Sequence, residues 1–219
     1  MNQRTIKFIC LAVLVLSPRG ASAGRNTFLS TYANYKLDVP WNWGIIQKAH
    51  DDIGEHLILN PKYQRVVELN IIAKKSDRPL VSMEIDSKLK VMITGYNNNF
   101  TDTRIERGPS VVPMGNRDSV GYLVNYNAPT PDGQKMSVRE TINFLNIKWG
   151  PSRYLHVLIT VRCPLYLAES YSPTLAKVLL GLTFWNPEAP EDARPAEARG
   201  PLPEDSRDID LLKSTVEKK

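Results

Sequence analysis

Cysteine is scarce in this 219-residue chain, which contains only Cys10 and Cys163. Cys10 follows Lys7-Phe8-Ile9 instead of small residues, so it does not fit a lipid-attachment site. It also lies in an N-terminal segment that we expect to be removed, which would leave Cys163 alone and exclude an intramolecular disulfide. Cys163 stands before Pro164 at the end of a predicted strand, where a small buried side chain is the ordinary role.

Patterns of catalytic and metal-binding residues are missing as well. Histidine occurs three times, at His50, His56 and His156, and no pair has the i,i+4 spacing of helical metal ligands. The glycines are scattered singly, so the sequence has no phosphate-binding loop. We therefore predict no catalytic residue, no metal and no cofactor. A hydrolase is our third hypothesis, although Ser119 lacks the leading glycine of a nucleophile elbow and Cys163 lacks a base.

A membrane-spanning run is also lacking at the N-terminus. The apolar run Phe8–Leu16 is far short of the roughly 20 residues that cross a bilayer. It is preceded by the basic Arg4 and Lys7 and followed by the small residues Ala21-Ser22-Ala23, an order typical of a secretory signal peptide. We predict a signal peptide over residues 1–23, cleavage near Ala23-Gly24, and a soluble periplasmic or secreted protein.

A strong charge of either sign is absent. The chain has 28 basic and 23 acidic residues, but Arg4, Lys7 and Arg19 lie in the predicted signal peptide, so 25 basic residues remain against 23 acidic ones. This excess is too small to indicate nucleic-acid binding. From Asn186 onward there are nine acidic and six basic residues, so a mildly basic domain precedes a mildly acidic tail. Solubility is the ordinary role of such a tail, and self-association is the alternative.

The chain does contain three strongly patterned strands in succession. Apolar and aromatic residues alternate with polar ones over Ser119–Asn127, Lys135–Lys148 and Arg153–Arg162. Alternation places successive side chains on opposite faces of a strand, and β-branched residues favour a half-buried sheet. Pro129–Gly133 and Gly150–Ser152 supply turn residues between the strands. The sequence therefore predicts an antiparallel meander, around which the other elements are arranged.

Further strands are predicted before this meander. Thr27–Val39 is expected to form a hairpin that ends at Pro40, because proline removes a backbone donor. Glu55–Asn60 and Arg65–Ala73 are two more strands, and the β-branched residues of the second predict a central position covered on both faces. His50-Asp51-Asp52 is expected to be a solvated loop.

The first of two predicted helices follows these strands. Ser76 or Asp77 is the expected N-cap, with Pro79 in the first turn, and Asn97-Asn98-Asn99 ends the helix. Apolar residues recur between them at helical spacing, so this helix is expected to lie across the sheet. Asn99-Phe100-Thr101 fits the N-glycosylation pattern, which matters only in a eukaryotic secretory route.

The second helix is predicted after the meander. A broad apolar stripe runs over Leu165–Leu182, and Pro173 is expected to begin a fresh helical segment or to kink the helix. Phe100–Pro113, before the meander, is expected to hold an edge strand that is broken at Gly108-Pro109. Thr183–Trp185 is expected to close the domain as a short extended segment.

Two tryptophans close to each other are candidate contact residues. Trp41 and Trp43 are separated by Asn42 alone, and we expect them to point to opposite sides of the chain. We predict that one is buried and the other more exposed. The functional interpretation is contact with a partner or ligand, and the structural alternative is a core residue with a neighbour at its rim.

The composition changes abruptly at Asn186. Five prolines are mixed with charged residues and alanine over residues 186–219, which predicts a disordered, semi-extended tail beyond a domain at residues 24–185. Ser206 is a possible cap for a short terminal helix, on which Ile209, Leu212 and Val216 would share a face. Such a helix is too short to be stable alone, so it either frays or docks on a partner.

The element order resembles a known family. The segment Tyr35-Lys36-Leu37-Asp38-Val39-Pro40 with Trp43 is followed by two strands, a long helix, the meander, and a helix that ends at Leu182-Thr183-Phe184. This order resembles the PsbP/DcrB-like fold, which the Mog-type Ran-binding proteins also use, over about Thr27–Trp185. The resemblance implies an α+β fold in which helices flank an antiparallel sheet as an α-β-α sandwich.

Members of this family are mostly non-enzymatic and bind or help to assemble protein complexes, some of them in membranes; some bacterial members are periplasmic. No residue of this sequence matches the metal or partner contacts of the photosynthetic branch, so no functional residue is carried over. A thylakoid role is not supported either, because the N-terminus resembles a bacterial signal peptide and not a Ser-rich transit peptide.

Three functional hypotheses follow. The first is an exported, non-enzymatic binding or assembly module that contacts a protein partner at the cell envelope, at most peripheral to the membrane, through Trp41, Trp43 or the tail residues Ile209, Leu212 and Val216. The second is a carrier of a small apolar or lipid-like ligand, held between sheet and helix near Trp41 or Trp43. The third is the hydrolase.

Overall fold

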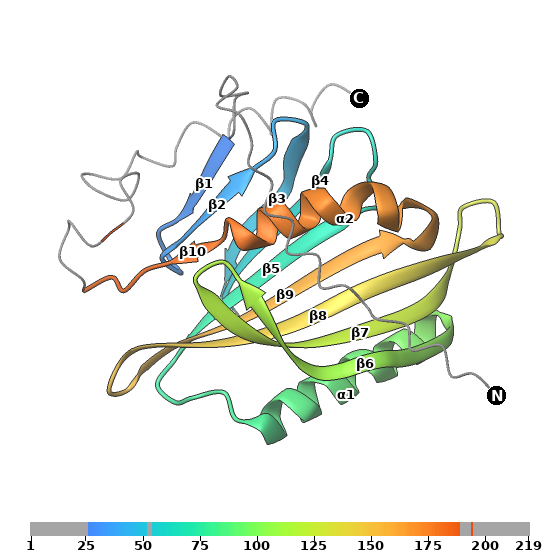
Figure 1. The fold of residues 1–219 in the computed structure, drawn as a ribbon. Coiled ribbons are helices and arrows are strands. Elements are labelled where there is room, and N and C mark those ends of the chain that lie inside the picture. Colours follow the sequence, from blue (N-terminus) through green and yellow to red (C-terminus); the bar gives the residue numbers. More distant parts are fainter. Residues whose placement is uncertain (1–25, 52–53, 189–193, 195–219) are drawn as a thin grey trace, which may run out of the picture.

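Strands dominate the computed structural model, which describes residues 26–51, 54–188 and 194 (Figure 1). All strand pairs in this part of the chain are antiparallel. The fold is therefore α+β, as expected. Its strands are β1 Asn26–Ser30, β2 Tyr35–Val39, β3 Trp43–Asp51, β4 Gly54–Pro61, β5 Glu68–Ser76, β6 Thr101–Met114, β7 Arg117–Pro129, β8 Lys135–Gly150, β9 Arg153–Pro164 and β10 Thr183–Phe184, and its helices are α1 Ser82–Asn99 and α2 Leu165–Leu180.

A large sheet forms the body of the described part, with strand order β3-β4-β5-β9-β8-β7-β6. The predicted meander is confirmed as β7, β8 and β9, each slightly longer than expected. β5 lies inside the sheet between β4 and β9, as predicted. Only one of its faces is fully covered, however: Leu69, Ile71 and Ala73 are buried, whereas Asn70 and Ile72 on the other face are half-buried.

The large sheet has a separate hydrophobic core on each face. On one face, Leu175 and Val178 of α2 belong to the same buried cluster as Ile71 of β5. On the other face, Ile85 and Leu89 of α1 are buried with residues of β7 and β8. The two helices thus lie on opposite sides of the sheet (Figure 1).

A second, three-stranded sheet lies beside α2, with strand order β1-β2-β10. Tyr35 of β2 and Phe184 of β10 are both buried, with ring centroids 5.7 Å apart. Asn116, in the turn between β6 and β7, donates from its side-chain amide to the Phe184 carbonyl at 2.8 Å. Because this small sheet shares one side of the large sheet with α2, the expected α-β-α sandwich describes the layers only in part.

The predicted start of the first helix is wrong. The Ser76 hydroxyl is engaged with the backbone of Arg78, and α1 begins only at Ser82. A Glu84 carboxylate oxygen accepts the Val81 N–H at 3.4 Å and so satisfies one of the free donors of the first turn. Pro79 therefore lies before the helix and not in its first turn, where it was predicted.

Two other predictions need correction. A single α2 runs from Leu165 to Leu180 through the exposed Pro173, so the predicted fresh segment is wrong; a kink there stays a prediction. The edge strand β6 does not stop at Gly108-Pro109 but continues to Met114, with irregular pairing around the proline. Irregular pairing tolerates proline because the missing donor faces no ladder partner.

Candidate functional site

The two candidate tryptophans lie in opposite environments, as predicted. Trp43 is 2% exposed and belongs to the core on the α2 side, whereas Trp41 is 63% exposed. A turn separates them, in which the Trp43 N–H donates to the Pro40 carbonyl at 2.9 Å. Trp43 is therefore a core residue, and Trp41 alone is available to a partner.

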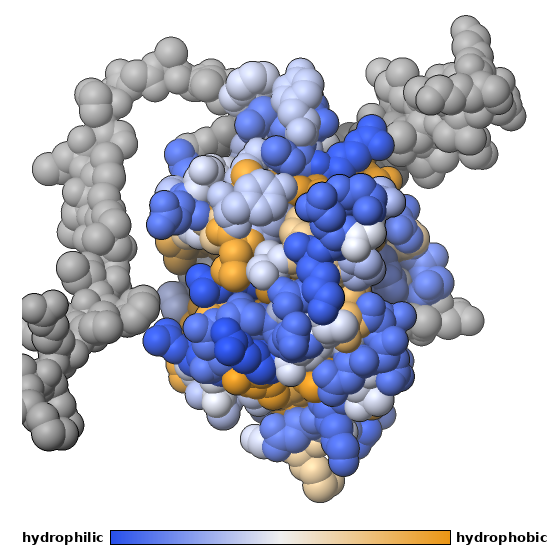
Figure 2. Space-filling view, turned by 90° about the vertical axis from the view of Figure 1, so that its right-hand side faces the viewer, coloured by the Kyte–Doolittle hydropathy of each residue, from blue (hydrophilic) through white to orange (hydrophobic). Residues whose placement is uncertain are grey.

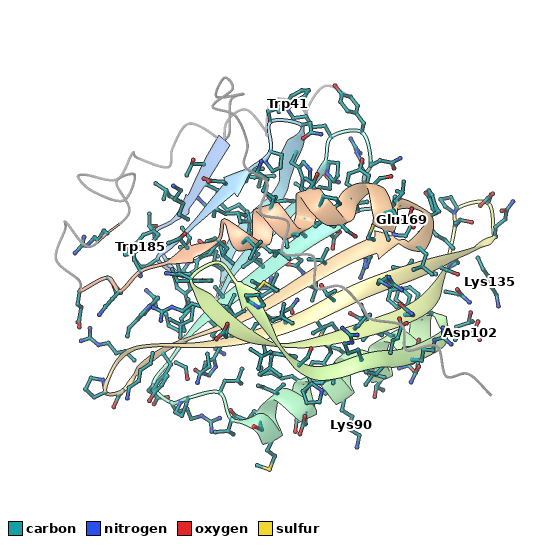
Figure 3. The ribbon with its side chains drawn as sticks, in the orientation of Figure 1. Trp41, Lys90, Asp102, Lys135, Glu169 and Trp185 are labelled. Atoms are coloured by element: carbon teal, nitrogen blue, oxygen red, sulfur yellow. The ribbon has the colours of Figure 1, made fainter. Side chains whose placement is uncertain are left out.

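A second exposed aromatic residue lies on the loop next to Trp41. Trp43 of β3 pairs with Pro61 of β4, so the loops beyond these two residues project from the same end of the sheet. The Lys62 N–H donates to the Asn42 carbonyl at 2.9 Å and joins the two loops. Tyr63, the next residue, is 87% exposed. We refer to Trp41 and Tyr63 together as the aromatic tip; Figure 3 shows Trp41 at one extremity of the molecule.

The aromatic tip continues into an open strand, β3. No strand of the described residues pairs with β3 on its outer side. Its middle section is solvent-exposed and includes Ile45 and Ile46, beside a bulge between Ile45 and Gln47. An edge strand of this kind presents free backbone donors and acceptors together with apolar side chains.

Strand β3 was missed by the sequence analysis, which treated His50 and Asp51 as part of a loop; Asp52 lies outside the described residues. Both residues pair with β4, and the His50 ring lies 4.3 Å from that of Tyr32, centroid to centroid. The available signal was the β-branched pair Ile45-Ile46. It was hidden because an edge strand with exposed residues on both faces shows no alternation.

The opposite edge of the sheet, β6, is protected against strand pairing. Its register with β7 shifts at three places, and Pro109 and Pro113 remove backbone donors. Arg104, Glu106 and Arg107 add charges along it. Bulges, prolines and charges are the features by which edge strands avoid adding another strand. Strand β3 has one bulge and no proline, so the two edges differ in their capacity to accept a partner.

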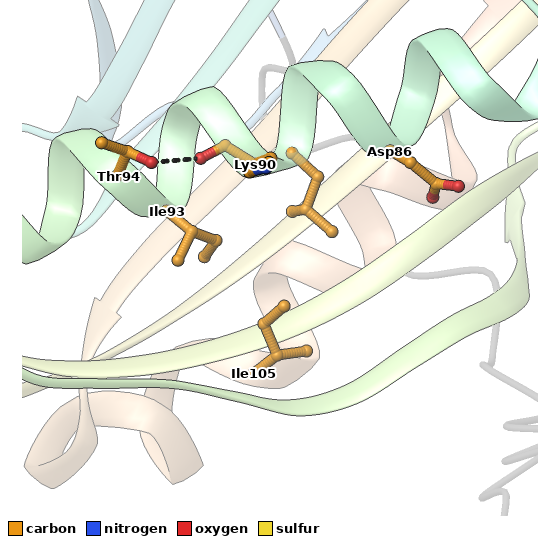
Figure 4. Close-up of a pocket in the computed structure, with 6 residues that line it drawn as sticks. Asp86, Lys90, Ile93, Thr94 and Ile105 are labelled. Atoms are coloured by element: carbon orange, nitrogen blue, oxygen red, sulfur yellow. Dashed lines mark hydrogen bonds between the residues drawn. The ribbon is translucent and has the colours of Figure 1, made fainter.

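A hollow of about 280 Å³ lies between α1 and β6 (Figure 4). Leu89, Ile93 and Ile105 supply its apolar lining, and Figure 4 shows Ile93 and Ile105 extending toward each other. This is a site between helix and sheet, as the carrier hypothesis expects. Neither Trp41 nor Trp43 lines it, so that part of the prediction is wrong for this hollow.

The nucleophiles of the hydrolase hypothesis are both buried and engaged elsewhere. The Ser119 hydroxyl donates to the Val112 carbonyl at 2.8 Å. Burial raises the pKa of the Cys163 thiol, which disfavours the reactive thiolate. Of the histidines, His156 approaches the Arg78 carbonyl through Nε2 at 2.9 Å, and His56 lies 3.8 Å from Asp51. The described residues thus offer no base hydrogen-bonded to either nucleophile.

The face of the sheet beneath α1 contains a buried polar group that sequence reasoning did not single out. The Tyr126 hydroxyl donates to Glu140 Oε2 at 2.8 Å, and Arg162 Nε approaches the same oxygen at 3.4 Å. Desolvation first, and then the Glu140 carboxylate, raises the pKa of Tyr126 and of Tyr96 well above the usual range for tyrosine. The group is enclosed by aromatic rings, since Phe100 stacks on Tyr126 with centroids 4.5 Å apart. Its role is structural.

The remaining predicted elements lie at the ends of the described residue range or outside it. The signal peptide with its Ala23-Gly24 site and the tail residues Ile209, Leu212 and Val216 lie outside the described residues. The first residues after β10 contact the β8–β9 hairpin, where Asn186 donates to the Trp149 carbonyl at 3.3 Å and Glu188 pairs with Arg153.

The described residues also lack a metal-binding cluster and a membrane-spanning helix. The described residues contain no group of three or more histidine, cysteine or acidic side chains arranged to hold a metal ion. Neither helix in the described part is long and apolar enough to cross a membrane.

Comparison with known proteins identifies the fold. No protein-family model and no curated protein matches the sequence. The solution structure of cyanobacterial PsbP (CyanoP) from Synechocystis sp. PCC 6803 superposes with a TM-score of 0.50 at 11% identity, over 78% of this chain and 99% of CyanoP. The fold is PsbP-like. The predicted resemblance is therefore confirmed at the level of the fold.

A second solved structure matches less well. The crystal structure of LpqN, a protein involved in cell envelope biogenesis of Mycobacterium tuberculosis, matches at a TM-score of 0.42 and 10% identity, over 73% of this chain and 90% of LpqN. At sequence identities this low, the similarity shows the fold alone, and a function has to be argued from the surface of this chain.

Proposed function

We propose that this protein is an exported, non-enzymatic binding module that contacts a protein partner at the cell envelope. The observation that carries the proposal is the open β3 edge, which lies beside the exposed Trp41 and Tyr63 while the opposite edge is protected. Binding requires no cofactor, metal or nucleic acid, and the contact with a membrane is at most peripheral.

The partner supplies an extended segment that pairs with β3. In such strand addition, main-chain hydrogen bonds give affinity, and side chains on alternate positions give specificity. Ile45 and Ile46 form the apolar part of this contact. Trp41 and Tyr63 act as aromatic anchors at the end of the edge, the kind of residue that contributes most to interface energy. The β7–β8 end of the molecule is less suited, because its apolar areas are small and divided by hydrophilic side chains in Figure 2.

Export is supported by the sequence alone, through the basic start, the apolar run Phe8–Leu16 and Ala21-Ser22-Ala23. Mass spectrometry of protein recovered from the periplasm or medium should find Gly24 at the N-terminus. Full-length protein retained in the cytosol would contradict export without affecting the binding proposal.

Cross-linking in cells tests the binding surface. A photo-crosslinking residue at position 46 should capture a protein that the same residue at position 111 of β6 does not capture. The captured protein is then purified, and its affinity is measured for the wild type, Ile46→Lys and Val111→Lys. Both positions are exposed apolar residues on edge strands, at 49% and 75% exposure, so the second variant is a matched control.

The expected result is at least tenfold weaker binding for Ile46→Lys and less than twofold for Val111→Lys. Amide hydrogen exchange of the complex should show new protection along β3, because strand addition occupies its free backbone groups. A partner that binds without changing β3 exchange would refute strand addition, and equal losses in both variants would refute the choice of edge.

The tail offers an alternative contact through Ile209, Leu212 and Val216. Truncation after Glu188 separates the two surfaces. If partner affinity is unchanged by truncation, docking through the tail is wrong; if the truncated protein no longer binds while β3 variants bind normally, the tail carries the contact.

The second candidate function is a carrier of a small apolar ligand, which the α1–β6 hollow favours. Its volume of about 280 Å³ lies just under the roughly 300–1,000 Å³ of drug-sized ligand sites, so only a small ligand would fit. Native mass spectrometry of the purified protein should then show an added mass that Ile93→Lys abolishes. A clean mass for wild-type protein isolated under native conditions would exclude this function.

A further inference from the structure

A second hollow, of about 240 Å³, lies at the start of α1 on the side of the sheet that α1 covers only in part. Lys74 of β5 and His156 of β9 are directly paired across the sheet and form its floor. Glu84 and Lys88 of α1 form one wall, and Arg78 in the preceding loop forms the other. Helix α1, on which Figure 3 labels Lys90, lies on the opposite side of the molecule from Trp41. The hollow is therefore separate from the aromatic tip.

Several interactions hold the residues that line the hollow in place, and they leave the lining with a net positive charge. Arg78 forms an ion pair with Glu84 at 2.7 Å, and the other Glu84 oxygen accepts the Val81 N–H. The Arg78 backbone is held by the Ser76 hydroxyl, and the Arg78 carbonyl accepts from His156 Nε2 at 2.9 Å. Arginine has five N–H donors, so donors remain on the guanidinium after it pairs with Glu84.

Lys74 and Lys88 are the two basic residues of the lining that are not paired with Glu84. Both are exposed at the mouth of the hollow, and neither forms a hydrogen bond or an ion pair with another of the described residues. Glu84 is the one acid among the residues that line the hollow, against Lys74, Arg78 and Lys88. The described lining thus carries two net positive charges over a small concave surface, with His156 counted as neutral.

We propose that this basic hollow binds a compact phosphate or phosphoester group. Its volume is below that of a drug-sized ligand site, so the bound part is a small anionic group and not an extended molecule. A phosphate monoester carries about −1.5 to −2 charges at pH 7, which matches the charge of the lining better than a single carboxylate does. Lys74, Lys88 and the free Arg78 donors approach such a group from three elements, and charge-assisted hydrogen bonds of this kind are the stronger ones.

The group belongs either to a soluble phosphorylated compound or to the headgroup of an anionic lipid. Titration of the mature chain with inorganic phosphate and with pyrophosphate, followed by amide NMR shifts, tests the first source. Co-sedimentation with vesicles of phosphatidic acid, whose headgroup is a phosphate monoester, and phosphatidylcholine, against vesicles of phosphatidylcholine alone, tests the second. Raising the salt concentration should weaken either form of binding, because the charges are exposed.

The variants are Lys74→Gln, Lys88→Gln and, as control, Lys90→Gln. Lys90 is an exposed lysine of the same helix that lines the other hollow, so its loss changes net charge equally. Circular dichroism verifies that all three fold. Lys74→Gln and Lys88→Gln should each weaken binding at least fivefold, and Lys90→Gln less than twofold, with ligand-induced shifts centred on Ser76, Arg78 and His156.

The results of these binding experiments separate the two ligand sources and test whether the site exists. Lysine-dependent binding of phosphate or pyrophosphate alone assigns a soluble ligand, and lysine-dependent binding of anionic vesicles assigns a lipid headgroup. No binding of any probe overturns the proposal, and so does an equal loss in Lys90→Gln, which would show general charge attraction without a site.

Discussion

Glu140 of β8 lies directly opposite Arg162 of β9, and the two side chains form an ion pair of 3.4 Å beneath α1. The carboxylate is nearly fully buried, whereas the guanidinium is partly open to solvent. The Tyr126 hydroxyl donates to the same carboxylate oxygen. A charge in this position is tolerated because both partners supply hydrogen bonds to it.

Replacing Glu140 by Gln should destabilise the domain more than replacing Tyr126 by Phe. Glu140→Gln leaves Arg162 without its counter-charge, and we expect a loss of about 2 kcal/mol in the free energy of unfolding, reduced from the buried-pair value because Arg162 reaches solvent. Tyr126→Phe removes one hydrogen bond and should cost about 1 kcal/mol. Urea denaturation measures both, and a larger loss for Tyr126→Phe would contradict this view of the group.

Stability should fall at alkaline pH. The pKa values of Tyr96 and Tyr126 are raised in the folded state, so their contribution is complete below the unfolded pKa of about 10 and is lost as pH rises toward the folded value. Above pH 10, each such tyrosine lowers the free energy of unfolding by about 1.4 kcal/mol per pH unit. Tyr126→Phe should flatten this slope in denaturation curves between pH 9 and pH 11. An unchanged slope would show that other groups govern alkaline unfolding.

The two tryptophans should respond oppositely to substitution. Trp43→Ala opens a cavity in the core and should cost about 3–5 kcal/mol of stability. Trp41→Ala should change stability by less than about 0.5 kcal/mol, because the side chain is exposed. It should nevertheless weaken partner binding at least fivefold. Calorimetry with the purified partner that cross-linking has identified measures this affinity. If Trp41→Ala leaves affinity unchanged, the aromatic tip is not part of the interface.

Gly115 should tolerate alanine far less than Gly133 does. Both glycines have positive φ angles, 59° and 79°, and alanine there costs about 1 kcal/mol of backbone strain. An added Cβ at Gly115 would also overlap the Leu182 carbonyl, whereas at Gly133 it meets nothing within 4 Å. We expect about 3 kcal/mol for Gly115→Ala, since overpacking adds about 2 kcal/mol to the strain. Thermal unfolding of the pair measures the difference, and similar melting temperatures would contradict it.

Sequence patterns predicted those parts of the fold that have one buried face. The meander and the stripe of α2 follow from alternation and helical spacing, and both are present. Strand β3 was missed because its exposed residues lie on both faces, so burial imposes no period on it. The far half of β6 was missed because Gly108-Pro109 was expected to break the strand, although burial alternates from Ser110 to Met114. At the start of α1, the side chain that accepts a free backbone N–H is Glu84 and not Ser76 or Asp77. The local sequence offers all three residues, so it does not determine where the helix begins.

The sequence predicted one of the two aromatic residues of the candidate site, Trp41. One buried and one exposed tryptophan were predicted, but spacing alone does not explain the outcome. Residues i and i+2 of an extended strand share a face, and the turn from Pro40 to Trp43 is what places the two side chains in different environments. Tyr63 was not found, since its proximity to Trp41 comes from the pairing of β3 with β4. The Lys74–His156 pair likewise depends on β5 lying next to β9, a contact between segments about eighty residues apart.

The small sheet has a consequence for the order in which the molecule is assembled. Strand β10 pairs with β2, near the other end of the described chain, and the Phe184 ring fills the core beside Tyr35. A polypeptide that emerges N-terminus first therefore cannot close its α2-side core until residue 184 is available. The core under α1 is built from residues 80–144 and is available earlier, so the two faces of the large sheet become closed one after the other.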